Sequence, residues 1–424
     1  MYLSRAGMIS VSREKGIETL RHEKKKYVIL IWGTVSLLLL GLIYAWSIFV
    51  VPLEREFGWT RVQTSMTYTI SMICMFVGMM LAGIISSRSG TRTTMILGIA
   101  LLTLGFVGSS RIANLGMLYV FYGVFVGTGV GLCYNTWLPS VMAWFPERSG
   151  FVSGIMLAGF GLGGLILGST MSALLNSSFG WRNTFLAVGI FALAESVIAM
   201  RYVLQTPPQA GATAKKSSAY EITPIQMLSD PTFYLFTVWK IMISAMAQSI
   251  IGHASPIATD IGAPVALASF MVGMISVGNG CGRTIGGILH DRFGTVRLMF
   301  GITAGFICSS VMLMFGYSSR NVTITILSFI VIGLSYGSLA LLTSAFINRT
   351  YGLKHFKTNY GINSMTSIPG TMLATYISVV KTNTGSYAGF FTIMMAVCIA
   401  AMIIPILLPG RIRRLYEKMD DLGT

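Results

Sequence analysis

The sequence predicts an all-α integral membrane protein whose twelve helices form two halves of six. Of its 424 residues, 54% are hydrophobic and only 10% are charged, and the mean hydropathy is +0.72. A chain of this composition has more apolar surface than one aqueous core can cover. Apolar stretches of about 20 residues, the length that a helix needs to cross a bilayer, recur along it. The short alternating segments of a transmembrane barrel do not appear.

Twelve stretches are predicted to span the membrane, with ends uncertain by about 3 residues. In chain order they are 27–51, 62–86, 93–112, 115–143, 150–175, 182–204, 232–258, 264–290, 296–316, 322–347, 356–380 and 386–408. The preceding stretch SREKGIETLRHEKKK is too mixed in charge for a signal peptide, and the first apolar stretch is too long. The first helix is therefore expected to be retained.

One long polar interruption, QTPPQAGATAKKSSAYEITPIQMLSDP at 205–231, divides the helices six and six. Its composition predicts a flexible cytoplasmic linker. The N-terminal half is then 1–204, including a cytoplasmic tail. The C-terminal half is 232–424, also with a tail. The two tails are 1–26 and 409–424.

The two halves repeat one short motif. Its members are Gly83, Arg88 and Gly90 of GIISSRSGTR and Gly287, Arg292 and Gly294 of GILHDRFGTVR, at a constant offset of 204. Two parallel six-helix repeats, with a substrate path between them near the bilayer centre, are a known plan of secondary transporters.

The distribution of Lys and Arg predicts the orientation. With a cytoplasmic N-terminus, 22 of the 30 basic residues lie on the cytoplasmic side and 6 on the opposite side, and Lys240 and Arg283 lie within helices. By the positive-inside rule, both termini are cytoplasmic. The net charge of +16 is spread over many loops, which favours contact with anionic lipid and gives no reason to expect nucleic acid. The compact loops and tails favour a bacterial cell inner membrane, and a monomer is expected.

No feature of the sequence favours an enzyme or a cofactor. The five cysteines all fall in predicted spans without ligand spacing, so neither disulfides nor a metal site are expected. They are Cys74, Cys133, Cys281, Cys308 and Cys398. The stretch GNGCGR fails as a dinucleotide motif because no strand precedes it. Phosphate loops and nucleophile elbows are also missing, so no catalytic residue is proposed.

GILHDRFGTVR resembles the loop motif of the major facilitator superfamily, in which a glycine permits a tight turn and an Asp and an Arg latch helices together on the cytoplasmic side. The resemblance implies the major facilitator fold and a latch that contains Gly287, Asp291, Arg292 and Gly294, with Arg88 in the first copy. The first copy departs from the motif, since Ser87 stands where an Asp is expected.

Three longer segments resemble the branch that contains oxalate:formate antiporters and monocarboxylate transporters. They are YAWSIFVVPLEREFGWTRVQTS, WFPERSGFVSGIMLAGFGLGG and NGCGRTIGGILHDRFG. The similarity extends over essentially the whole chain, and it implies transport of small organic anions.

Arg283 is the first candidate for binding such an anion. It lies 8 residues from Asp291, about 12 Å along a helix, which is too deep for easy snorkelling. A buried guanidinium persists only where water, a cavity or a partner compensates it. Asn279, four residues earlier, shares its helix face and is neutral. An unpaired guanidinium beside an amide suits a carboxylate. The alternative is a structural pairing with Glu195 or with helix carbonyls.

The branch resemblance narrows the substrate. Members that exchange dicarboxylates have a second cation on the eleventh helix, whereas this chain has Met365 and Thr366 in the middle of that helix and no internal charge. A single cation favours a monocarboxylate such as lactate or pyruvate. In animal monocarboxylate transporters an Asp implicated in proton coupling precedes the Arg by four residues. Asn279 stands there in this chain, so that proton route is closed.

His253, the one histidine within a predicted span, is the candidate for proton coupling, because imidazole titrates near neutral pH. It is expected about 15 Å from Arg283 in depth, and it can equally be a hydrogen-bonded packing residue. Alternatively, Arg283 itself links transport to protons if the empty charged site reorients poorly.

Three tyrosines are further candidates for the substrate site, because each can donate a hydroxyl hydrogen bond to a small acid. Tyr336 lies among small residues, whereas Tyr122 and Tyr387 lie toward the outer side and fit core packing or an interfacial belt equally well. Lys240 is expected to snorkel to the cytoplasm or to pair with Glu195 and is left out of the site.

The sequence therefore predicts a secondary active transporter that moves a small monocarboxylate with a proton. The alternative within the same fold is oxalate:formate-type anion exchange. A transport-dead nutrient sensor would need an appended signalling domain, for which the tails are too short, and a channel would not show saturable counterflow.

Overall fold

The computed structural model describes residues 24–203, 221–373, 380–381 and 383–421. The expected N-terminal tail up to residue 23, the linker up to residue 220 and residues 374–379 of the expected eleventh helix lie outside this part. Within it the regular structure is helical throughout.

The N-terminal half consists of long helices with short connections. In chain order it contains the span Lys24–Ala45, whose last turn is η1 (Gly41–Ala45), then α2 (Ser47–Phe57), α3 (Arg61–Ser109), α4 (Leu115–Leu118), η2 (Tyr119–Val126), α5 (Gly127–Met142), η3 (Pro146–Arg148), α6 (Ser149–Asn176) and α7 (Gly180–Val203). Polar caps fix several starts, as where Thr60 and Gln63 form a reciprocal capping box at α3.

The C-terminal half follows the same plan. It contains α8 (Pro224–Leu228), α9 (Pro231–Asp260), α10 (Val265–Ser318), α11 (Val322–Tyr351), α12 (Phe356–Met365), α13 (Ser367–Leu373), α15 (Ala388–Ala401) and α16 (Ile403–Asp421).

The helices account for the expected twelve spans. Nine helices of the described part are long and apolar enough to cross a membrane. Two of them, within α3 and α10, each combine two expected spans that meet at a non-helical glycine. The start of the eleventh span is α12 with α13. The predicted all-α membrane fold is thereby confirmed.

The internal repeat is visible in the backbone. Gly90 and Gly294, which are 204 residues apart, break their helices with φ of 85° and 79°. Gly58 and Gly262, at the same offset, have φ of 68° and 92°. These positive values favour glycine because it has no Cβ. Both halves therefore turn at matching points.

Two expected boundaries differ in the structure. Residues 409–421, expected as a tail, continue α16 as a helix through Pro409. The end of the expected linker folds onto the C-terminal half, where the Ile222 amide donates to the Tyr351 carbonyl at 2.9 Å and the Asn359 amide donates to the Ile222 carbonyl at 3.0 Å.

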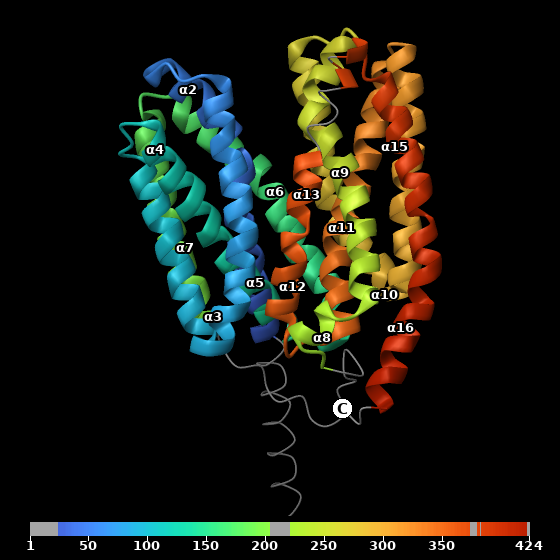
Figure 1. Cartoon of the computed structure of the whole chain (residues 1–424). Helices are drawn as coiled ribbons and strands as arrows, with labels where there is room; N and C mark the ends of the chain where they lie inside the picture. Colours follow the sequence, from blue (N-terminus) through green and yellow to red (C-terminus); the bar gives the residue numbers. More distant parts are fainter. Residues whose placement is uncertain (1–23, 204–220, 374–379, 382, 422–424) are drawn as a thin grey trace, which may run out of the picture.

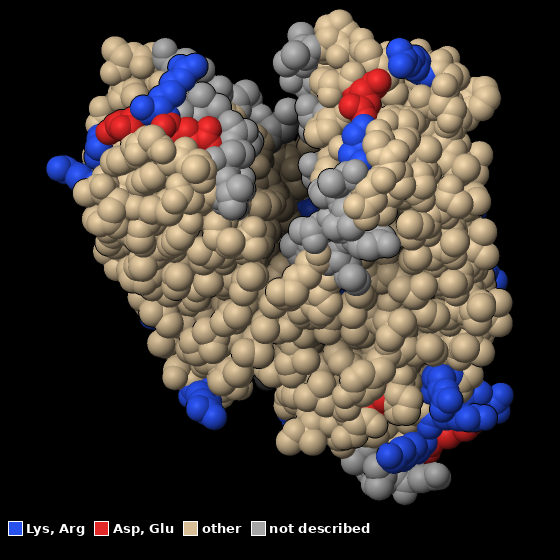
Figure 2. Space-filling model, turned by 45° about the horizontal axis from the view of Figure 1, so that its top comes forward, with Lys and Arg blue, Asp and Glu red and all other residues tan. Residues whose placement is uncertain are grey.

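The two halves stand side by side and touch at one end (Figure 1). This end, which carries Gly90, Gly294 and α8, is called the motif end, and the opposite end is called the far end. Figure 2 shows a hollow between the halves that opens at the far end. Contacts between the halves join α6 to α10 and α3 to α12.

Candidate functional site

Arg283 lies inside α10 with only 3% of its surface exposed. Its Nε donates to Asn279 Oδ1 at 3.2 Å, and its Nη1 donates to the Leu157 carbonyl of α6 at 2.5 Å. The guanidinium carbon stands 5.6 Å from the Phe160 ring centroid. None of the ion pairs among the described residues includes Arg283. Its positive charge is thus held by neutral acceptors and an aromatic face.

Small residues allow α6 to approach Arg283 this closely. A Cβ at Gly161 would lie 3.3 Å from the guanidinium carbon, and one at Gly154 would lie 2.8 Å from the Arg283 carbonyl oxygen. Across the interface, a Cβ at Gly280 would meet Leu162 at 2.9 Å. The glycines of both helices therefore set the spacing at which the guanidinium reaches the α6 backbone.

Aromatic rings surround the guanidinium from both halves. The ring of Phe160 meets Tyr44 edge to face at 5.3 Å and Tyr134 at 4.9 Å. The hydroxyl of Tyr134 lies 3.3 Å from that of Tyr360 on α12. These four residues form what we call the aromatic box. Tyr134 and Tyr360 are close enough to Arg283 to interact electrostatically.

The predicted site residues fall into separate groups. Asn279 and Tyr336 lie near Arg283, the first by a hydrogen bond and the second within electrostatic range. Tyr122 packs instead inside the N-terminal half, with its ring 4.5 Å from that of Trp46. His253 and Tyr387 lie together, with ring centroids 6.1 Å apart.

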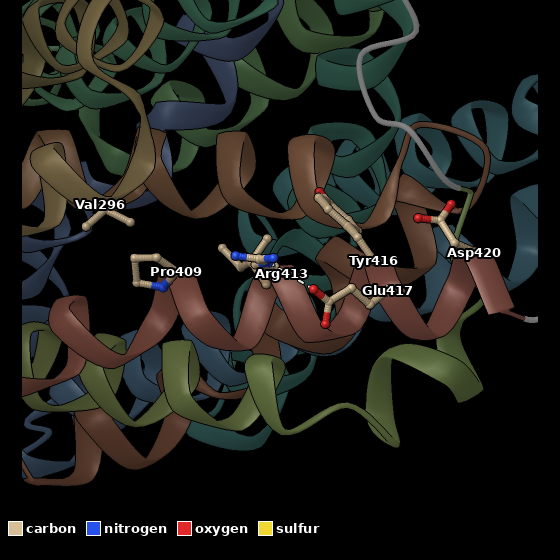
Figure 3. Close-up of a pocket in the computed structure, with 7 residues that line it drawn as sticks. Val296, Pro409, Arg413, Tyr416, Glu417 and Asp420 are labelled. Carbon is tan, nitrogen blue, oxygen red and sulfur yellow. Dashed lines mark hydrogen bonds and ion pairs between the residues drawn. The ribbon is translucent and has the colours of Figure 1, made fainter.

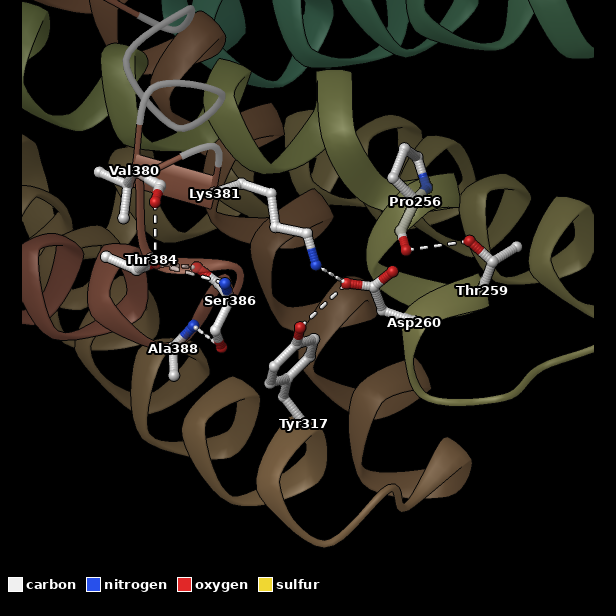
Figure 4. Close-up of polar contacts among 9 residues, drawn as sticks. All are labelled: Pro256, Thr259, Asp260, Tyr317, Val380, Lys381, Thr384, Ser386 and Ala388. Atoms are coloured by element: carbon white, nitrogen blue, oxygen red, sulfur yellow. Dashed lines mark hydrogen bonds and ion pairs between the residues drawn. The ribbon is translucent and has the colours of Figure 1, made fainter.

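A polar cluster lies at the far end of the C-terminal half, where Asp260 at the end of α9 meets Tyr317 and Lys381 (Figure 4). Asp260 accepts hydrogen bonds from Lys381 and, at 3.0 Å, from the Tyr317 hydroxyl. The hydrogen bond to Asp260 raises the pKa of Lys381 above its ordinary value. The Lys381 ammonium also stands 4.7 Å from the Tyr387 ring centroid.

Lys240 neither snorkels nor pairs with Glu195, so that expectation is wrong. Its ammonium donates to the Asn363 carbonyl at 2.8 Å, to Asn363 Oδ1 at 3.0 Å and to Thr366 Oγ1 at 3.3 Å. Glu195 accepts from the Ser36 hydroxyl at 2.6 Å in the other half. The end of α12 and Thr366 thus supply all three acceptors of Lys240.

The motif residues lie where the halves meet. Asp291 accepts a hydrogen bond at 3.0 Å from the backbone N–H of Phe151, in the first turn of α6. Helix N-termini attract negative charge, which explains an acid there. A Cβ on Gly287 would lie 2.8 Å from the Gly150 carbonyl oxygen, so glycine permits the contact.

The two motif arginines do not join this contact. Arg292 stacks on the neighbouring Phe293 ring at 5.3 Å. Neither Arg292 nor Arg88 belongs to an ion pair of the described residues.

A surface groove of about 480 Å³ runs along α16 (Figure 3). Arg413 pairs there with Glu417 at 2.9 Å, and Val296 and Pro409 line one end. No lining residue of this groove contacts Arg283, so the groove is not part of the central site.

Several residues of the central site could not be found from the sequence. The chain contains 17 tyrosines, and nothing in the sequence sets Tyr44, Tyr134 and Tyr360 apart from the others. Their only signal was residue type, which they share with Tyr336. The tertiary contact with Phe160 selects them.

Two repeated helical halves meet around Arg283, a buried cation without an acidic partner among the described residues. This arrangement defines a membrane transport protein built from two helical bundles. The chain belongs to the Major Facilitator Superfamily, whose family model matches residues 31–251 and 240–417. The chain is therefore a transporter of this superfamily, a class whose members are not enzymes.

Three similar proteins match most of the chain, and two of them carry names of the expected branch. An uncharacterized MFS-type transporter, YhjX of Escherichia coli strain K12, is 27% identical over 80% of this chain and 84% of its own length. The oxalate:formate antiporter of Oxalobacter formigenes is 22% identical over 90% and 91%. Monocarboxylate transporter 13 of Rattus norvegicus is 23% identical over 88% and 86%.

Solved structures agree on the fold. The proton:xylose symporter XylE has a TM-score of 0.69 at 14% identity, over 92% of this chain and 96% of that chain. The E. coli fucose:proton symporter FucP has a TM-score of 0.67 at 14% identity, over 91% and 99%. At these identities the likeness concerns the fold alone.

Proposed function

We propose that this transporter moves small monocarboxylates, such as lactate or pyruvate, together with a proton by alternating access across a cell inner membrane. The observation that supports this function is Arg283, a buried cation between the halves that has no acidic partner among the described residues. Monocarboxylate transporters and an oxalate:formate antiporter among the relatives support the same substrate class.

The guanidinium chemistry suits a carboxylate. Planar N–H groups bind the two oxygens of a carboxylate in parallel, and the charge strengthens each bond. Nη1 is held by the Leu157 carbonyl, which belongs to the other half. A carboxylate bound to Arg283 would compete with this carbonyl, so substrate binding and separation of the halves would be linked.

Arg283 can link transport to protons if its empty charged site reorients poorly, but a side chain that itself carries the proton must be a second group, since an arginine stays protonated. We keep His253 as the proposed group. Its Nδ1 lies 3.0 Å from the Ser249 carbonyl oxygen, and Tyr387 lies against its ring. The proton would thus bind nearer the far end than the carboxylate does.

We assign the motif end to the cytoplasm, with both termini there. Most of the basic residues belong to the tails and loops that lie on the same side as the N-terminus, and such an excess marks the cytoplasmic side. The hollow of Figure 2 then faces outward, while Asp291 and its partner close the inner side.

Organic anion exchange of the oxalate:formate type is the second candidate. Lys240, a second buried cation in the C-terminal half, favours it, because a chain with two buried cations can bind more negative charge.

The test is uptake of labelled L-lactate into proteoliposomes, with and without an inward proton gradient. Wild type should accumulate lactate with the gradient, and Arg283→Gln should not. The matched control is Arg111→Gln, which removes an exposed positive charge and should transport as wild type does. Trans-stimulated oxalate or formate exchange without lactate uptake would contradict symport and favour the antiporter. Equal uptake by wild type and Arg283→Gln would remove Arg283 from the site.

A further inference from the structure

Lys240 is buried in α9 with 6% of its surface exposed. Its three hydrogen-bond acceptors are neutral, and they all belong to the end of α12 and the residue that follows it. It belongs to no ion pair of the described residues. An ionisable group in a membrane helix without a counter-ion is a candidate for function.

The acceptors lie where the eleventh span is interrupted. α12 ends at Met365, and α13 begins at Ser367. Pro369 has no N–H, so it cannot donate to the carbonyl of Met365 four residues earlier. Helix C-termini carry partial negative charge, which explains why an ammonium settles at this break.

The amide of Asn363 adds an unused donor. Its Oδ1 accepts from Lys240, which fixes the orientation of the amide. Its Nδ2 is then left buried without a hydrogen-bond partner, on a side chain with 0% exposure. A buried donor without an acceptor costs about 1–3 kcal/mol. The break therefore holds a positive charge and an unsatisfied N–H side by side.

We propose that Lys240 Nζ and Asn363 Nδ2 form a second binding subsite for a small carboxylate, separate from Arg283. The proposal rests on the proposed function, since it takes the same class of substrate. The unsatisfied amide donor requires an acceptor and the ammonium lacks a counter-ion, and a carboxylate supplies a negative oxygen to each. Thr366, whose hydroxyl accepts from Lys240, is half-buried at the break.

The two cations have separate surroundings. Arg283 bonds to α6 and α10, whereas Lys240 bonds to α12 and Thr366. Tyr360 connects them, because it belongs to the aromatic box and precedes Asn363 by three residues, about 4.5 Å along the helix. A carboxylate could therefore occupy two successive positions along α12.

The ammonium and the guanidinium would bind differently. Lysine presents a point charge, whereas arginine presents a planar pair of donors. The subsite at Lys240 is thus expected to accept carboxylates with less regard to their orientation than Arg283 does.

The experiment is equilibrium binding of labelled L-lactate to the purified full chain in lipid nanodiscs. Wild type should bind more than one lactate per chain. Arg283→Gln should keep the lactate at Lys240, Lys240→Gln should keep the lactate at Arg283, and a variant with both changes should bind none. Lys354→Gln, which removes an exposed lysine just before α12, is the matched control and should bind as wild type does.

Asn363→Asp tests the subsite while preserving the fold. Its carboxylate would satisfy Lys240 from within, so this variant should lose one lactate while its Tm rises. A purely structural role for Lys240 predicts the higher Tm with unchanged lactate binding, which would overturn the proposal.

Other outcomes separate this proposal from the proposed function. If Lys240→Gln bound lactate as wild type does and Arg283→Gln bound none, the second subsite would be overturned while the function stood. If either single variant lost all binding in folded protein, a separate subsite would likewise be overturned. Absence of saturable lactate binding in wild type would overturn both.

Discussion

The two copies of the loop motif make the same backbone turn, but different hydrogen bonds connect each copy to the other half. In the second copy, Asp291 accepts from the N–H of Phe151 at the start of α6. In the first copy, Ser87 donates back to its own helix at the Ile84 carbonyl, at 2.8 Å. The crossing bond there comes from the opposite side, where the Lys357 ammonium donates to Thr91 at 2.7 Å.

We call the polar contacts between the halves at the first motif copy, around Thr91 and Lys357, the first joint, and those at the second copy, around Asp291 and Phe151, the second joint. The side-chain amide of Asn135 also belongs to the first joint. It donates to the carbonyl of Met79 in its own half and to that of Lys357 in the other, both at 2.6 Å. Both copies of the repeat therefore turn at the same glycine, Gly90 or Gly294, while different polar contacts close the two joints.

Breaking the second joint should have the largest effect. In Asp291→Asn the charge at the α6 N-terminus disappears, and a charge-assisted hydrogen bond contributes about 2 kcal/mol, or about 30-fold in an equilibrium constant. Hydrogen–deuterium exchange at Phe151 should accelerate, and lactate uptake should fall. Asp420→Asn, an exposed acid at the same end, is the control. Unchanged exchange at Phe151 would show that the carboxylate does not close this joint.

Breaking the first joint should have the next largest effect. Asn135→Ala removes the amide that donates to the buried Met79 carbonyl and to the half-buried Lys357 carbonyl, which should lower the free energy of unfolding by about 1–3 kcal/mol. The measurement is the Tm of the purified protein. Asn183→Ala is the control, since its amide donates to the Phe179 carbonyl directly before its own helix and not to the other half. Equal Tm values for the two variants would contradict a bridging role for Asn135.

Ser87→Asp would make the first joint resemble the second. Gly83 lies against the backbone of Thr358, near the start of α12, so Ser87→Asp brings an acid toward that N-terminus. A stabilisation of about 0.3–1 kcal/mol is expected, with slower exchange at the first amides of α12 and slower transport. Ser87→Asn has nearly the same shape without the charge and should show less of either change. Identical exchange in the two variants would mean that charge plays no part.

Substitutions at two ion pairs of the far end should have the smallest effects on stability. The two effects should depend on pH in opposite directions. Glu56 accepts from Trp181 Nε1 and pairs with Arg182 at 2.7 Å, and these contacts, the Trp181 bond first, lower its pKa. Its stabilisation is present near neutral pH and is lost as acid takes the pH down through this lowered pKa. Because the pair is exposed, the effect should be small.

Lys381, bonded to Asp260, has a raised pKa. The stabilisation that this bond provides is fully present at pH values below the ordinary pKa of lysine, and it is lost as the pH rises through the raised pKa of Lys381. Tm curves against pH should therefore flatten on the acid side in Glu56→Gln and on the alkaline side in Lys381→Gln. A reversal of these sides would contradict the assignments.

Hydropathy and charge suffice to predict the helices and the central cation. The spans, the glycine turns and Arg283 follow from residue type and spacing. The helix over residues 409–421 could not be predicted in this way. Pro409 and the charges after it suggest a tail, whereas α16 continues through them. The hydrogen bonds of Lys240 could not be predicted from the sequence either, since they depend on where the eleventh span breaks and on which helix packs beside the break.

The bond from Arg283 to Leu157 ends on a backbone oxygen. Every amino acid supplies that oxygen, so an alanine scan of α6 would record position 157 as silent with respect to this contact. Genetic screens that read importance from intolerance to substitution would assign the interaction to one partner alone. Backbone chemistry, such as an ester in place of the amide, would be needed to reveal the other.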